Sequence, residues 1–133
     1  MPTNFETIKQ AGEEMLISLN QKFHVDLGYN KQTVNWLDWY ISQNRDYFSK
    51  TEVQKMTLSI GYILGEAIIQ EYGGEWQYDE DFHQWVVDIG KGKANPIGKT
   101  RKYFEDYLDS IESFFEIIGT FKQNTDSDFS EEN

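Results

Sequence analysis

The fold is decided by residues 52–90, which read EVQKMTLSIGYILGEAIIQEYGGEWQYDEDFHQWVVDIG. Residues 52–72 carry apolar side chains around most of a helical circumference, a pattern typical of a central helix that is covered on several sides. Gly73 and Gly74 end that helix, because glycine readily adopts the left-handed conformation that follows a helix. Apolar and polar residues then alternate, and a β-rich run follows an acidic turn, so 75–90 is predicted to form a β-hairpin.

Amphipathic helices are predicted on both sides of this stretch, because apolar residues recur there at three- and four-residue spacing. Gly61 and Gly65 would let another backbone approach the central helix closely. Three N-terminal helices, a small antiparallel hairpin or sheet, and one or two C-terminal helices define an α+β fold. The flanking helices are predicted over residues 4–23, 32–44, 97–106 and 110–122.

One domain is predicted over residues 1–122, which is close to the commonest domain size. Asp109 and Glu112 have the spacing of a capping box at the start of the last helix. Residues 123–133 are polar and acidic, and we expect them to form a disordered tail.

The chain is strongly acidic: its 133 residues include 23 acidic and 12 basic side chains, a formal charge of −11. This balance argues against a nucleic-acid binder, because phosphate backbones are held by clustered Lys and Arg. The chain has no cysteine, which excludes disulfides, thiolate zinc sites and Cys nucleophiles. No apolar run approaches the ~18 residues that span a bilayer, and the first residues lack the pattern of a secretory signal. We therefore expect a cytoplasmic protein that contacts neither nucleic acid nor membrane.

The charges are segregated along the chain. Residues 66–90 hold seven acids and no base, and residues 91–102 hold five bases and no acid. From residue 103 onward nine acids face only Lys122. The basic segment either offsets the acidic blocks on each side of it or forms a patch for an anion or a partner.

No motif in the chain predicts a metal, a cofactor or a catalytic residue. Gly98-Lys99-Thr100 matches the end of a P-loop, but the glycine that the motif needs at position 93 is Lys93. The acidic turn near His83 lacks the ligand spacing and the glycine of a calcium loop.

Carboxylate chemistry remains an alternative. An enzyme of unknown chemistry would use Glu71 or Glu75 together with Lys99 or Arg101. Helical periodicity places Glu71 on the apolar face of the central helix and Glu66 on its polar strip. We therefore expect Glu71 to be the buried acid of that helix.

A set of residues with structural roles, taken in their order along the chain, resembles the pattern of a known protein family. They are Tyr29, Val34, Trp36-Leu37-Asp38, Tyr40-Ile41, Gly61-Tyr62-Ile63-Leu64-Gly65-Glu66, Tyr72-Gly73-Gly74-Glu75-Trp76, Asn95-Pro96, Lys99 and Arg101-Lys102. In this order they resemble a group of small uncharacterised bacterial α+β domains, over roughly residues 27–118. Relatives of this kind occur as stand-alone proteins and beside bacterial toxins as immunity proteins. The resemblance implies the fold and a protein partner, and it brings no catalytic residue with it.

Charge and likeness together predict a non-enzymatic protein that binds another protein, most plainly an immunity protein for a bacterial toxin with a basic cleft. An acidic surface would be steered to such a cleft and would plug it. A phage- or mobile-element-encoded inhibitor of a host protein is the alternative and would have the same physical signature. The predicted partner-binding residues are Glu75, Trp76, Tyr78, Asp79, Glu80, Asp81, Glu105, Asp106 and Asp109, with Trp76 or Tyr78 as anchors.

A second candidate interface lies on the helix predicted over residues 32–44. Trp36 and Trp39 fall opposite Val34 and Ile41, which form the core stripe of that helix. Either the helix is sandwiched between two layers, or the two tryptophans form a surface patch for a partner, since tryptophan is enriched among residues that dominate binding energy.

Overall fold

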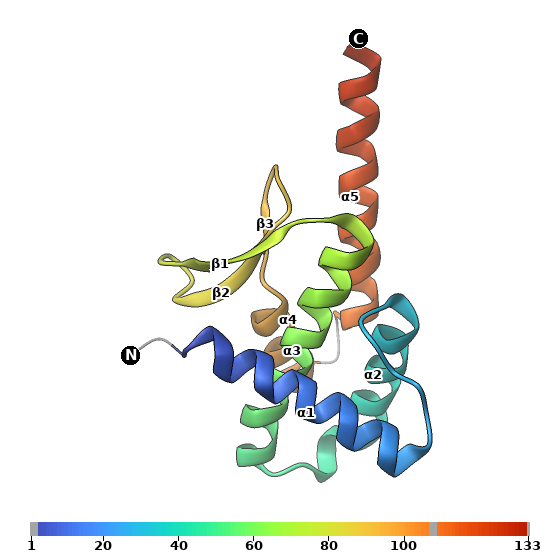
Figure 1. Cartoon of the computed structure of the whole chain (residues 1–133), viewed down its shortest axis with the longest axis vertical. Helices are drawn as coiled ribbons and strands as arrows, with labels where there is room; N and C mark the ends of the chain where they lie inside the picture. The colour runs from blue at the N-terminus through green and yellow to red at the C-terminus, as the bar shows by residue number, and fades with distance from the viewer. Residues whose placement is uncertain (1–2, 107–108, 133) are drawn as a thin grey trace.

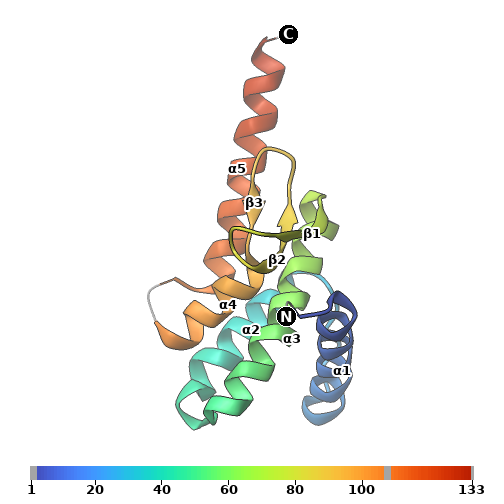
Figure 2. The same ribbon diagram turned by 90° about the vertical axis from the view of Figure 1, so that its left-hand side faces the viewer.

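Helix α3 (Lys50–Tyr72) is the centre of the computed structural model, as its apolar circumference predicts. It begins with a complete capping box, in which Ser49 and Glu52 each accept a hydrogen bond from the other residue's backbone N–H. Ten of its residues are buried, from Thr57 to Ile68. The other helices lie around it, with α1 crossing it and α2 and α4 beside it (Figures 1 and 2).

The described residues, 3–106 and 109–132 with side chains up to residue 122, confirm the α+β class. This part of the chain forms five α-helices and one small antiparallel sheet, which lies to one side of the helices (Figure 1). No helix within it is both long and apolar enough to cross a bilayer. The elements other than α3 are α1 (Phe5–Phe23), α2 (Lys31–Asn44), η1 (Arg45–Tyr47), β1 (Glu75–Asp79), β2 (Gln84–Asp88), β3 (Lys93–Ala94), α4 (Pro96–Glu105) and α5 (Ile111–Glu132).

Small residues let the elements around α3 pack closely. A Cβ at Gly12 of α1 would lie 2.5 Å from the Tyr62 ring, and a Cβ at Gly61 would lie 2.6 Å from Ile97 of α4. A Cβ at Gly65 would overlap the ring of Trp76. Glycine is required at these crossings because real Cβ atoms essentially never approach so closely.

The predicted hairpin is confirmed, and the sheet has one strand more than the sequence predicts. Strand β1 pairs antiparallel with β2, Trp76 opposite Val87, after a turn in which Gly73 and Gly74 have φ of 87° and 122°. Strand β3 adds to the other edge of β2 through only two residue pairs, one of which joins Asp88 to Lys93. A strand this short leaves no periodic pattern in the sequence.

Helix α5 differs from its prediction at both ends. Its cap is Ser110 rather than Asp109, since the Ser110 hydroxyl accepts from the N–H of Ser113 at 3.1 Å. The helix continues to Glu132 instead of ending near residue 122, and its end projects away from the other elements in both views (Figures 1 and 2). Asn133 and the side chains beyond residue 122 lie outside the described part, so the predicted disorder of 123–133 stays a prediction.

A buried polar network joins α2, η1, α4 and α5. The Tyr103 hydroxyl donates to Asp38 at 2.8 Å, and the other oxygen of Asp38 accepts from the N–H of Glu112 at 2.9 Å. The guanidinium of Arg45, also buried, lies 4.4 Å from the centre of the Tyr103 ring. Burial and the neighbouring Asp38 raise the pKa of Tyr103 to about 12. Asp38 thereby fixes the start of α5 from another helix.

Candidate partner-binding site

The acidic tip of the hairpin is held together by Asp79. Its carboxylate accepts from the backbone N–H groups of Asp81 at 2.8 Å and Phe82 at 3.0 Å, and it pairs with Lys93 at 2.9 Å. The hydrogen bond from Lys93 and those from the turn lower the pKa of Asp79. Asp79 is only 6% exposed. It therefore belongs to the framework of the hairpin and not to the exposed acidic surface in which the sequence places it.

The other predicted hairpin acids are exposed but do not form one cluster. Glu80 and Asp81 lie at the tip, beside Phe82, which is 56% exposed. Glu75 lies opposite Asp88 at the far end of β1, about 14 Å away at ~3.4 Å per strand residue. The tip and the base of the hairpin thus present separate negative charges.

Trp76 and Tyr78, the predicted anchors, are half-buried. The Trp76 ring stacks on Tyr62 at 5.8 Å with planes 4° apart, and its Nε1–H donates to Glu66 at 2.9 Å. Tyr78 packs edge-on against Trp85 at 5.7 Å. These contacts hold both rings in fixed orientations.

These rings belong to a larger set that we name the aromatic row. Phe5 of α1 joins it in the middle, with its ring 5.5 Å from Trp76 and 5.0 Å from Trp85. The row runs from the loop before α2, across α3, to the hairpin, and a hollow of about 360 Å³ opens at its end between Phe5, Tyr78 and Trp85. In spatial order its members are Tyr29, Tyr62, Trp76, Phe5, Trp85 and Tyr78.

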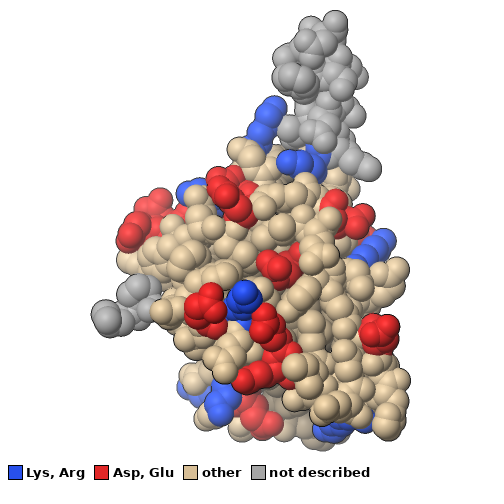
Figure 3. Space-filling model, in the orientation of Figure 1, with Lys and Arg blue, Asp and Glu red and all other residues tan. Residues whose placement is uncertain are grey.

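Three carboxylates lie along the aromatic row. Burial raises the pKa of Tyr62, and the charges of Glu66, Glu13 and Glu6 raise it further, in that order. The pKa of Tyr29 is raised by burial and then by Glu13 and Glu66. Figure 3 shows acidic side chains at the centre of this side of the molecule, where α1 crosses α3, with a basic side chain among them. We name the aromatic row together with Glu6, Glu13 and Glu66 the α1–hairpin face.

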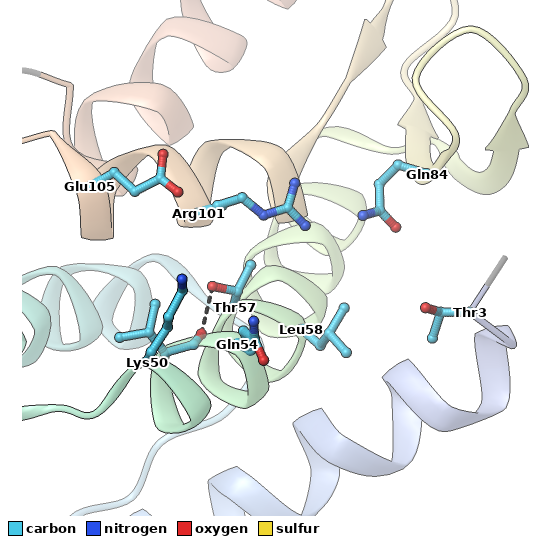
Figure 4. Close-up of a pocket in the computed structure, with 9 residues that line it drawn as sticks. Thr3, Lys50, Gln54, Thr57, Leu58, Gln84, Arg101 and Glu105 are labelled. Atoms are coloured by element: carbon cyan, nitrogen blue, oxygen red, sulfur yellow. Dashed lines mark hydrogen bonds between the residues drawn. The ribbon is translucent and has the colours of Figure 1, made fainter. Parts of the chain in front are cut away.

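The three predicted acids after the basic segment are dispersed near the end of α4. Asp109 pairs with Lys99 at 3.5 Å, and Asp106 is the C-cap of α4, where its backbone N–H donates to the carbonyl of Lys102 at 2.7 Å. Glu105 is exposed and lines a hollow that it shares with Arg101 and Lys50. Arg101 lies between Glu105 and Gln84 of the hairpin (Figure 4), and the predicted residues do not form one continuous acidic surface.

The basic segment offsets acids on both sides of it, one of its two predicted roles. Lys93 pairs with Asp79 of the preceding acidic block, and Lys99 pairs with Asp109 of the following one. Arg101 points instead into the hollow of Figure 4.

In the second candidate interface, on α2, one tryptophan packs in the core and the other is exposed, so each of the two predictions holds for one of them. Trp36 packs against the core and stacks on Tyr40, with ring centres 5.2 Å apart and planes 14° apart. Trp39 is 53% exposed and its ring lies 5.8 Å from Trp36. Phe23 at the end of α1 completes this aromatic group, 5.4 Å from Trp36. The α2 side therefore has a structural tryptophan and an exposed one.

The sequence interpretation did not include Glu6, Glu13 or Glu66 among the partner-binding residues, and it exchanged the burial of Glu66 and Glu71. Glu71 is exposed, and Glu66 is the half-buried acid of α3, bonded to Trp76. Gly12 is the residue that could have indicated this site in the sequence. A small residue on an amphipathic helix marks a place where another helix crosses closely, and Glu13 follows Gly12 directly.

Among the described residues no group of three His, Asp or Glu side chains is placed to hold a metal ion. Comparison of the chain with family models, curated proteins and solved structures finds no significant match.

Proposed function

We propose that this chain is a non-enzymatic protein-binding protein, a cytoplasmic immunity protein that neutralises a cognate bacterial toxin by covering its active site with an acidic surface. The observation that carries the proposal is the α1–hairpin face, where Glu6, Glu13 and Glu66 lie along a row of aromatic rings. The interface proposed here includes the predicted anchors Trp76 and Tyr78.

This combination of groups suits a partner rich in Arg and Lys. Carboxylates attract these cations over a distance, and aromatic faces bind guanidinium and ammonium groups at contact. Enzymes that act on nucleic acids or nucleotides hold their phosphates with Arg and Lys, so their clefts present this chemistry. The hollow between Phe5, Tyr78 and Trp85 is large enough to receive a side chain from such a cleft.

The rigidity of the face favours binding. The Trp76 indole is fixed by its bond to Glu66, and the Trp85 indole donates to the carbonyl of Thr3 at 2.9 Å. Groups that are already ordered lose little conformational entropy when a partner binds. The net charge of −11 adds long-range attraction toward a basic partner.

The test begins with the product of the gene next to this one. Co-expression of this chain should restore growth of cells that produce the toxin, and the purified proteins should bind with an association rate that falls as salt rises. Glu6→Gln combined with Glu13→Gln should slow association roughly tenfold at low salt.

The matched control is Glu14→Gln combined with Glu71→Gln, which changes the net charge by the same amount. Glu14 and Glu71 are exposed, and neither is among the acids that act on Tyr62. Equal slowing by both double variants would mean that only net charge matters and would remove the α1–hairpin face from the interface. Binding to an acidic partner, insensitive to salt, would overturn the proposed function.

A further inference from the structure

We propose that the hollow between α3, α4 and the start of β2 binds a small oxyanion, the carboxylate or phosphate group of a small molecule. The hollow has a volume of about 350 Å³, within the lower range of small-molecule sites. It is lined by residues other than those of the α1–hairpin face, so this proposal does not depend on the proposed function.

Two cations from different helices line the hollow. Lys50 is the first residue of α3, and Arg101 lies in the middle of α4, 51 positions further along the chain. Figure 4 shows the guanidinium of Arg101 directed across the hollow toward Gln84, with Lys50 on the α3 side. A guanidinium binds carboxylate and phosphate oxygens in pairs, and an ammonium adds a compact charge.

Within the described residues Lys50 and Arg101 form no ion pair, as is also true of the exposed Lys55 and Lys102, but only Lys50 and Arg101 line the hollow. Lys93 and Lys99 form ion pairs, and Lys122 donates to the carbonyl of Ile89 at 2.9 Å. Across residues 3–106 and 109–122, neither Lys50 nor Arg101 has a carboxylate oxygen within 4.0 Å. In a chain with nearly twice as many acids as bases, two such cations at one hollow are ready to receive an anion.

The neutral polar groups add donors on the same side. The side-chain oxygen of Gln84 accepts from the N–H of Trp85 at 3.0 Å, which leaves the amide NH₂ of Gln84 to donate into the hollow. The hydroxyl of Thr57 is committed as a donor to the carbonyl of Val53 at 2.7 Å, so it adds no donor (dashed line in Figure 4). The donors that can reach the anion are therefore Arg101, Lys50 and Gln84, with Gln54 at the rim.

The remaining lining residues set the kind of anion. Glu105 brings one negative charge, so the hollow carries a net charge of +1 and should favour a singly charged anion. Val53 and Leu58 give the α3 wall an apolar part that can contact the carbon atoms next to the charged group.

Titration of the full chain with sodium phosphate and, separately, with sodium acetate tests this proposal, with ¹⁵N NMR as the readout and ionic strength held constant with NaCl. We expect saturable shifts of the Gln84 side-chain amide and of the Arg101 Nε–H. Arg101→Gln should weaken binding by about tenfold or more, because a charge-assisted pair is lost. Glu105→Gln should strengthen it, because a repulsive carboxylate is removed.

Lys102→Gln is the matched control, since Lys102 is the neighbour of Arg101 on α4, is exposed, and does not line the hollow. It should change the affinity less than Arg101→Gln does. Saturation by acetate alone supports a carboxylate ligand, and saturation by phosphate alone supports a phosphate ester. Shifts that rise linearly with both anions, or an equal effect of Arg101→Gln and Lys102→Gln, would overturn the proposal. Unchanged spectra of the other residues in Arg101→Gln would show that the variant is folded.

Discussion

Replacement of Gly65 by alanine tests whether the contact between α3 and the hairpin is as close as the structure shows. The new methyl group would overlap Cζ2 and Cη2 of Trp76 and would lie 3.2 Å from Cγ of Pro96. The indole cannot simply rotate away, because it is stacked on Tyr62 and its Nε1–H is bonded to Glu66. The ring must shift as a unit and lose that bond.

The cost follows from three effects. Overpacking of this size costs about 1–3 kcal/mol. Loss of the hydrogen bond to Glu66 adds about 1 kcal/mol, and the better helix propensity of alanine returns about 1 kcal/mol. The net destabilisation is therefore about 1–3 kcal/mol, which lowers Tm by roughly 4–10 °C at ~2.1 cal/mol/K of unfolding entropy per residue.

Calorimetry of Gly65→Ala measures the loss, and the indole N–H resonance of Trp76 reports the displaced ring. Gly92→Ala is the control, since no atom lies within 4 Å of a Cβ built at Gly92. It should leave Tm nearly unchanged. A Gly65→Ala protein as stable as the wild type, with an unshifted Trp76 resonance, would refute the close approach of the hairpin to α3.

Three further predictions concern other parts of the molecule. Asp79→Asn should lower Tm at neutral pH and make the stability of the fold less sensitive to acid. The pKa of Asp79 is lowered in the folded state, so the ionised carboxylate stabilises the fold above about pH 4. This stabilisation is lost as the pH falls further. Equal acid denaturation midpoints for the variant and the wild type would contradict this. Tyr103→Phe should lower the free energy of unfolding by about 1 kcal/mol, because the hydrogen bond to Asp38 is lost. The raised pKa of Tyr103 stabilises the wild-type fold below about pH 10, and this contribution is lost between about pH 10 and 12. The variant should therefore lose less stability than the wild type over that pH range. Urea titrations at pH 8 and pH 11 measure both effects, and identical pH dependence of the two proteins would exclude Tyr103 as the cause. Deletion of residues 124–133 should change Tm by no more than about 2 °C in a calorimetric scan, since this acidic segment carries little apolar area; a larger loss would show that the segment docks on the domain.

The sequence predicts those elements whose signals are local. Helix α3, the turn at Gly73 and Gly74, and the hairpin each follow from a periodicity or a glycine within a few residues. Strand β3 and the exact start of α5 depend on partners elsewhere in the chain. Lys93 is positioned by Asp79, which lies 14 residues away, and the first turn of α5 is bonded to Asp38 of α2, 74 residues away.

Contacts between distant residues also explain why the sequence misplaced part of the candidate site. The sequence identifies an acidic turn, but the burial of Asp79 results from Lys93, which belongs to another strand. Glu66 and Glu71 are little more than one helical turn apart on α3, and only the neighbours of that helix decide which of them is buried. Strand β1 covers the Glu66 side through Trp76, while Glu71 remains exposed.

The acids of the α1–hairpin face are difficult to explain by stability alone. Glu6, Glu13 and Glu66 all raise the pKa of the buried Tyr62, and like charges near one another disfavour the folded state unless cations balance them. Lys9 shares the α1 face of Glu6 and Glu13, at three- and four-residue spacing, and balances part of this charge. Elsewhere in the described part of this chain, Asp79, Asp109 and Glu116 each lie within 4.0 Å of a lysine nitrogen. Proteins tolerate such local costs mainly where a surface has work to do besides folding. A basic partner would balance the negative charge that remains after Lys9, and this balance of charge is the physical basis for placing the interface on the α1–hairpin face.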